Sequence, residues 1–132
     1  MAEAIRTATD APFGETLAAW VRRTPGAIGA VLSDEDGNAV DFAHLPDRVS
    51  ELDIQIFGAQ LCFATRTYSR WSLRNGMGPR PLLLVECTRR IVLCQMPADG
   101  FFASGLLERP AGLGHALAAW HVAVEAMRRL LE

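Results

Sequence analysis

The sequence predicts an α+β fold: a five-stranded antiparallel sheet with one long helix on one face and two terminal helices on the other. Two observations predict it. Hydrophobic periodicity indicates the order helix, two strands, helix, three strands, helix. The later strands lack the alternation of apolar and polar residues that a half-solvated sheet shows, so both faces should be covered. With 132 residues, 50% of them hydrophobic, the chain has the size of one domain, assigned to residues 11–132 after a flexible tail over residues 1–10.

The first helix and a β-hairpin follow this tail. Pro12 offers a helix start, and Thr24-Pro25-Gly26 ends the helix. Two short apolar strands over residues 27–33 and 39–43 then flank the segment Asp34-Glu35-Asp36-Gly37-Asn38. Asp and Asn side chains bond their own backbone in such segments and glycine supplies a positive φ, which is typical of a hairpin turn.

A long helix is expected over residues 47–75, with Asp47 or Ser50 as its N-cap and a glycine-rich segment after Asn75 as its end. At about 100° per residue its apolar residues fall on two stripes. One stripe contains Val49, Leu52, Ile56, Ala59 and Phe63. The other contains Ile54, Phe57, Leu61, Ala64, Tyr68 and Trp71. One stripe suffices to pack the helix on its own sheet, so we expect another protein surface to cover the second.

Three strands and a helix complete the chain. The strands are expected over residues 82–88, 91–96 and 101–107. After Pro110, apolar positions step by three and four from Leu113 to Leu131, which predicts a strongly amphipathic terminal helix.

The composition excludes several classes of function. A net charge of −2 gives no electrostatic basis for nucleic-acid binding. The 3 cysteines are odd in number and irregularly spaced, which argues against a disulfide framework and favours a reducing cytoplasm. We expect no signal peptide and no membrane insertion, because no apolar run approaches the roughly 18 residues of a membrane span.

Three arginines on the long helix, Arg66, Arg70 and Arg74, are spaced by four and continue the first stripe toward the helix C-terminus. They form either a basic strip beside an apolar anchor for an acidic partner or a solvated surface near a helix end. Gly58 at mid-helix costs about 1 kcal/mol relative to alanine, and we expect close approach of another molecule's helix, rather than of the protein's own sheet, to explain it. The candidates for a dimer or partner interface are Leu52, Ile56, Ala59, Phe63, Arg66, Arg70 and Arg74.

No catalytic residue, cofactor site or metal site is predicted, and the protein is expected not to be an enzyme. The acidic turn after residue 33 fails the calcium-loop pattern because its glycine comes too early. The cysteines Cys62, Cys87 and Cys94 lie in apolar runs, where cysteine behaves as a small buried hydrophobe. His44 is expected in a surface loop.

The element order and the hairpin resemble the roadblock family, which is named after a dynein light chain. The family hairpin reads G-x-x-G-A-x-x-x-D-x-x-G, and Gly26, Gly29, Ala30, Asp34 and Gly37 fit it. This resemblance implies a homodimer or heterodimer in which sheets join edge to edge and two long helices lie side by side. It brings no shared catalytic motif with it.

The resemblance also implies a class of partner. Roadblock proteins scaffold or regulate small Ras-like GTPases or attach to dynein. By this resemblance the chain looks like a bacterial member of the family, similar to the GTPase-activating partner of the gliding-motility GTPase. The expected function is therefore a dimeric scaffold or regulator of a Ras-like small GTPase. The alternative is a profilin-like or PAS-like ligand-sensing module, for which Glu86, Gln95 and Ser104 are the candidate polar groups inside an apolar cavity.

Overall fold

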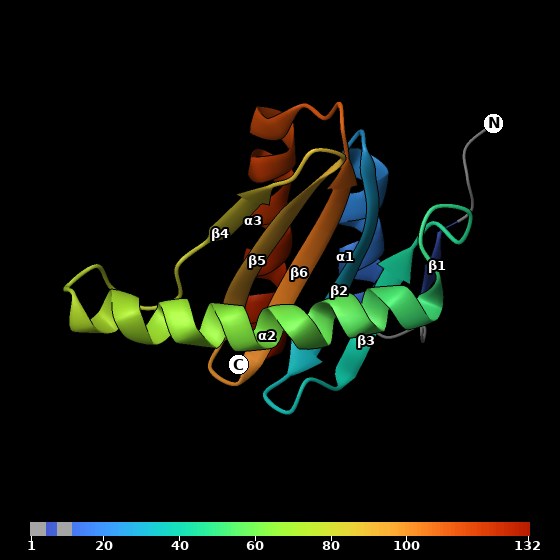
Figure 1. Cartoon of the computed structure of the whole chain (residues 1–132). Coiled ribbons are helices and arrows are strands. Elements are labelled where there is room, and N and C mark those ends of the chain that lie inside the picture. Colours follow the sequence, from blue (N-terminus) through green and yellow to red (C-terminus); the bar gives the residue numbers. More distant parts are fainter. Residues whose placement is uncertain (1–4, 8–11) are drawn as a thin grey trace.

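A six-stranded antiparallel sheet lies between two layers of helices in the computed structural model, which describes residues 5–7 and 12–132 (Figure 1). The strand order is β1-β3-β2-β6-β5-β4. The strands are β1 (Arg6–Thr7), β2 (Ala27–Asp34), β3 (Ala39–His44), β4 (Leu83–Glu86), β5 (Arg90–Ala98) and β6 (Phe101–Glu108). The long helix α2 (Glu51–Arg74) crosses one face, and α1 (Pro12–Arg23) and α3 (Leu113–Leu130) cover the other.

The predicted number of five strands is wrong, because β1 lies in the segment expected to be a tail. Arg6 pairs with His44 and Thr7 with Ala43 at the outer edge of β3. Such a two-residue strand has no hydrophobic period by which a sequence pattern reveals it. The rest of the expected tail, residues 1–4 and 8–10, lies outside the described residues. The strand expected over residues 82–88 is also shorter, because β4 contains only Leu83–Glu86.

The turn between β2 and β3 confirms the hairpin prediction. Asp34 Oδ1 accepts hydrogen bonds from the backbone N–H groups of Asp36 (3.0 Å) and Asn38 (2.9 Å). Gly37 has a φ of +85°, which only glycine adopts freely. The carboxylate of Asp34 thus organises a turn.

The core between the sheet and the terminal helices is centred on two tryptophans. Trp20 of α1 and Trp120 of α3 are both almost fully buried and meet edge to face, with ring centroids 5.1 Å apart. Gly105 in β6 lies directly beneath both indoles. The two tryptophans can therefore pack in the larger of the two hydrophobic cores only because residue 105, in a central strand, has no side chain.

The long helix begins at Glu51, because Ser50 and not Asp47 is its N-cap. Ser50 Oγ accepts a hydrogen bond from the backbone N–H of Asp53 (3.0 Å), which satisfies one of the free donors at the helix start. Just before the helix, His44 is buried and its Nδ1 lies 2.8 Å from the carbonyl oxygen of Val49. The expectation of an exposed loop histidine is therefore wrong. Val49, from the first stripe, is likewise buried against the sheet.

Candidate partner interface

The side of α2 that rests on the sheet is built mainly from small and polar residues. Its buried positions are Ile54, Gly58, Cys62, Thr65 and Ser72. A Cβ on Gly58 would lie 2.6 Å from Val31 Cγ1 and 2.7 Å from Ser33 Oγ of strand β2. The mid-helix glycine thus allows α2 to approach its own sheet, so the expected contact with another molecule's helix is wrong.

This close approach predicts the effect of Gly58→Ala. The added methyl overpacks the helix–sheet contact, which typically costs about 1–3 kcal/mol, whereas the better helix propensity of alanine returns only about 1 kcal/mol. We expect a lower free energy of unfolding in urea denaturation. Gly114→Ala in α3, where a Cβ would meet nothing within 4 Å, is the control and should be neutral or stabilising. Equal stability changes in the two variants would contradict the packing argument.

Cys62, on the packed side of α2, and Cys94, on the strand β5 below it, belong to a buried polar layer. Thr65 Oγ1 donates to Cys94 Sγ (2.7 Å), and Cys94 Sγ lies 3.2 Å from Ser104 Oγ. Burial raises the pKa of the Cys62 thiol to about 11 and also raises the pKa of Cys94. Both thiols are therefore protonated at neutral pH and unsuited to nucleophilic attack. Cys87 is exposed, so the expectation that all three cysteines are buried fails for this residue.

The side of α2 that faces away from the sheet is apolar and uncovered. Leu52 is 65% exposed, Ile56 46% and Phe63 74%, and Ala59 is exposed as well. Aliphatic and aromatic side chains exposed to this extent along one face of a helix are typical of interaction surfaces. These four residues are the apolar part of the predicted interface, and we call them the outer face of α2.

The predicted arginine strip divides into two parts. Arg66 donates from its guanidinium to the carbonyl oxygen of Glu35 and lies over the ring of Phe102, 5.5 Å from its centroid. It therefore connects α2 to the β2–β3 turn. Arg70 and Arg74 are exposed and remain available to a partner. Residues 54–85 contain four arginines and no acidic residue, which makes this part of the surface cationic although the whole chain is slightly acidic.

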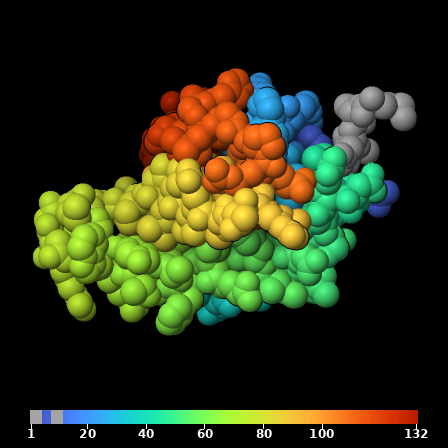
Figure 2. All heavy atoms as spheres, turned by 45° about the horizontal axis from the view of Figure 1, so that its top comes forward, coloured from blue at the N-terminus to red at the C-terminus, as the bar shows by residue number. Residues whose placement is uncertain are grey.

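The C-terminal end of α2 extends beyond the sheet, past β4 (Figure 1). A helix of 24 residues is about 36 Å long, whereas the spacings of six strands span about 24 Å. Figure 2 shows the end of α2 and the segment that follows it forming one end of the molecule. Exposed apolar side chains gather there, namely Tyr68, Trp71, Leu73 and Met77.

Strand β4 beside this overhang is also incompletely covered. It is the last strand of the sheet, and within the described residues only β5 pairs with it. Leu84 and Val85 are 37% and 47% exposed. An exposed apolar edge strand offers free N–H and C=O groups to another strand. Sequence periodicity placed Tyr68 and Trp71 on the second apolar stripe of the long helix, and only the position of β4 reveals that they lie beyond the sheet.

A groove of about 540 Å³ separates the N-terminal half of α2 from the β4–β5 hairpin. Phe57 and Val92 supply apolar walls, and Asp53, Arg89 and Arg90 supply charges. The groove lies on the same flank of α2 as Trp71, because residues 57 and 71 are separated by almost four full turns. In the described part of the chain no group of three or more His, Cys, Asp or Glu side chains is placed to hold a metal ion.

No protein-family model and no curated protein matches the chain. Solved structures do match. A Roadblock/LC7 domain from Streptomyces avermitilis is 18% identical, with a TM-score of 0.77 over 89% of this chain and 95% of that one. Myxococcus xanthus MglB is 10% identical, with a TM-score of 0.79 over 92% and 96%. The gliding protein MglB from Thermus thermophilus is 16% identical, with a TM-score of 0.76 over 87% and 84%.

These likenesses concern the fold, because the identities are low. They extend over 87% to 92% of this chain. Among the described residues no helix has both the length and the hydrophobicity that crossing a bilayer requires. The resemblance that the hairpin and the element order indicate is confirmed: this chain has the fold of the Roadblock/LC7 domain.

Proposed function

We propose that the protein is a dimeric, non-enzymatic regulator or scaffold of a Ras-like small GTPase, which it recognises through its paired long helices. The observation that carries this proposal is the outer face of α2, where apolar side chains point away from the protein's own sheet. The roadblock fold supports the class of partner.

The dimer is proposed to form through β4 and the overhanging end of α2. Antiparallel pairing of β4 with β4 of a second copy would satisfy the free edge and continue the sheet. The twofold axis of such a pair keeps both α2 helices on the same face and makes them antiparallel. The overhang of each helix, with Tyr68 and Trp71, then lies over the partner's sheet, near the groove beside Phe57.

The charges along α2 favour this antiparallel arrangement in a homodimer. The helix begins with Glu51 and Asp53 and ends with Arg70 and Arg74. Antiparallel pairing places the acidic end of each helix beside the basic end of the other, whereas parallel pairing would place like charges together. Such complementarity contributes mainly to orientation and specificity.

The outer faces of the two helices would then form one continuous platform for the GTPase. Leu52, Ile56 and Phe63 supply apolar anchors, and the exposed guanidinium groups of Arg70 and Arg74 suit an acidic rim on the partner. Thr65 and Ser72 on the packed side of α2 are hydrogen-bonded within the protein, and we propose that the platform acts by binding and not through a catalytic group.

The test is an affinity pull-down from native lysate with the purified protein, with GDP and with a non-hydrolysable GTP analogue, read by mass spectrometry. Recovery of a Ras-like GTPase with the GTP analogue alone would support regulation of its active state. Equal recovery with both nucleotides would support a scaffold. Absence of a GTPase from both samples would contradict the proposed partner.

Phe63→Glu should abolish GTPase recovery without dissociating the dimer. The new carboxylate would lie in the centre of the apolar platform, and burying it unpaired in a complex is costly. At least a tenfold loss of bound GTPase is expected in titrations. Leu130→Glu introduces the same charge at a 44% exposed position of α3 and should bind normally. Loss of the GTPase by both variants would show that the effect is not specific to the platform.

A further inference from the structure

An apolar groove between α1 and α3 lies on the other face of the sheet, away from the proposed dimer and GTPase surfaces. Its volume is about 550 Å³, within the range of small-molecule sites. Trp20 and Ala123, both nearly buried, line it at depth, and Val122, 61% exposed, lies at its rim. Burial of such a surface by an apolar ligand would be favourable.

The groove exists because the facing side chains are small. Ala19 of α1 and Ala119 and Ala126 of α3 line it where larger residues would have filled the space between the helices. Thr16 also lines it, but its hydroxyl already donates to the carbonyl oxygen of Pro12 (2.9 Å). The body of the groove therefore suits a hydrocarbon chain.

One end of the groove is cationic. Arg23 ends α1 there, and the Nε2 atom of His115 donates to the Arg23 carbonyl oxygen at 2.8 Å, which holds the two helix ends together. The Arg23 side chain is exposed and forms no ion pair within residues 5–7 and 12–132. None of the residues that line this groove is acidic, so nothing in its lining neutralises the guanidinium.

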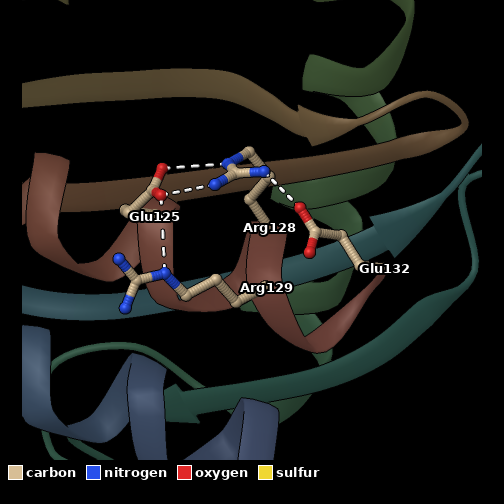
Figure 3. A network of polar contacts seen from close by, with 4 residues as sticks. All are labelled: Glu125, Arg128, Arg129 and Glu132. Carbon is tan, nitrogen blue, oxygen red and sulfur yellow. Dashed lines mark hydrogen bonds and ion pairs between the residues drawn. The ribbon is translucent and has the colours of Figure 1, made fainter.

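The opposite end offers no comparable charge. A shallower hollow continues the groove past Val122 and Ala126 to Glu125. Figure 3 shows the Glu125 carboxylate held by Arg128 and Arg129, while Arg128 also contacts Glu132. Arg128 hydrogen bonds hold the pKa of Glu125 below its usual range. This network is locally balanced, which leaves Arg23 as the unpaired cation of the groove.

We propose that this groove binds a small amphiphilic carboxylate, with its hydrocarbon chain along Trp20, Ala119 and Ala126 and its carboxylate at Arg23. The apolar contact supplies most of the affinity, and the guanidinium fixes the orientation through a charge-assisted hydrogen bond. The site is independent of the proposed dimer and GTPase surfaces. It places ligand binding outside the sheet and not at Glu86, Gln95 and Ser104, the positions that the sequence suggested for a sensor pocket.

The probes are decanoate, decanol and decyltrimethylammonium, each kept below its micelle concentration and titrated into the whole protein. We expect saturable one-to-one binding of decanoate by calorimetry, weaker binding of decanol and weakest binding of the cation. Tryptophan fluorescence should change with the same midpoint, because Trp20 lines the groove. Absence of saturable binding, or equal binding of all three probes, would overturn the proposal.

Two variants locate the site. Arg23→Gln should weaken decanoate binding about threefold, as loss of an exposed ion pair does, and leave decanol binding unchanged. Arg22→Gln, adjacent but not in the groove lining, is its matched control. Ala119→Phe should abolish binding of both probes, with circular dichroism confirming that it folds. Unchanged decanoate binding in both groove variants would place the ligand elsewhere and refute the assignment.

Discussion

Replacing Trp71 with glutamate is expected to convert the proposed dimer into a monomer. Trp71 is 53% exposed on the part of α2 that extends beyond β4, and an antiparallel second copy would bury it between the two helices. Removal of a buried tryptophan anchor commonly costs about 2 kcal/mol or more, and an unpaired carboxylate in its place adds a desolvation penalty. The dissociation constant should therefore rise by at least about 100-fold.

Leu73→Glu provides the matched control. Leu73 is also apolar and 58% exposed, but two positions along a helix differ by about 200°. Leu73 thus lies on the flank shared with Arg66, which faces the β2–β3 turn, and not on the flank of Trp71. Sedimentation equilibrium over a range of concentrations should show a monomer for Trp71→Glu and a dimer for Leu73→Glu. The opposite result would place the helix–helix contact on the other flank.

Much of the fold could be predicted because its elements have clear periods. Each pattern is visible within one continuous stretch of sequence. This holds for the two stripes of α2, for the hairpin turn with Gly37 and for the amphipathic α3. Strand β1 could not be predicted, because its two residues pair with Ala43 and His44 but are too few to show a hydrophobic period. The burial of His44 was equally hidden, since it depends on a hydrogen bond to Val49 at the start of the next element.

The interface on α2 could be predicted only in part, because periodicity shows apolar residues but not the tertiary contacts that cover them. Periodicity showed that α2 has more apolar surface than one sheet can cover, but it does not reveal which side packs. The packed side relies on Gly58, Thr65 and Ser72, which a search for apolar residues passes over. The exposure of Trp71 depends on where the sheet ends, and the groove beside Trp20 depends on the distance between two helices. Both are properties of the tertiary structure.

Gly105→Val, in the core between the sheet and the terminal helices, is expected to be strongly destabilising. A Cβ at this position would lie 2.7 Å from Trp20 Cη2 and 2.8 Å from Trp120 Cζ3. Both indoles are buried, with exposures of 2% and 0%, and neither can move without opening the core. Overpacking by one methyl typically costs about 1–3 kcal/mol, and valine adds two more carbons, so we expect a loss of about 3 kcal/mol or more.

For a chain of this length such a loss lowers Tm by about 10 °C, which differential scanning calorimetry would detect readily. Trp120→Leu removes one of the two rings that the valine meets, and alone it should destabilise by opening a cavity. In the double variant the new side chain would occupy part of that cavity, so the combined loss should be smaller than the sum of the single losses. Strict additivity of the two losses would mean that a side chain at position 105 and the Trp120 ring do not compete for the same space. That result would contradict the proposed packing of Gly105 against the two tryptophans.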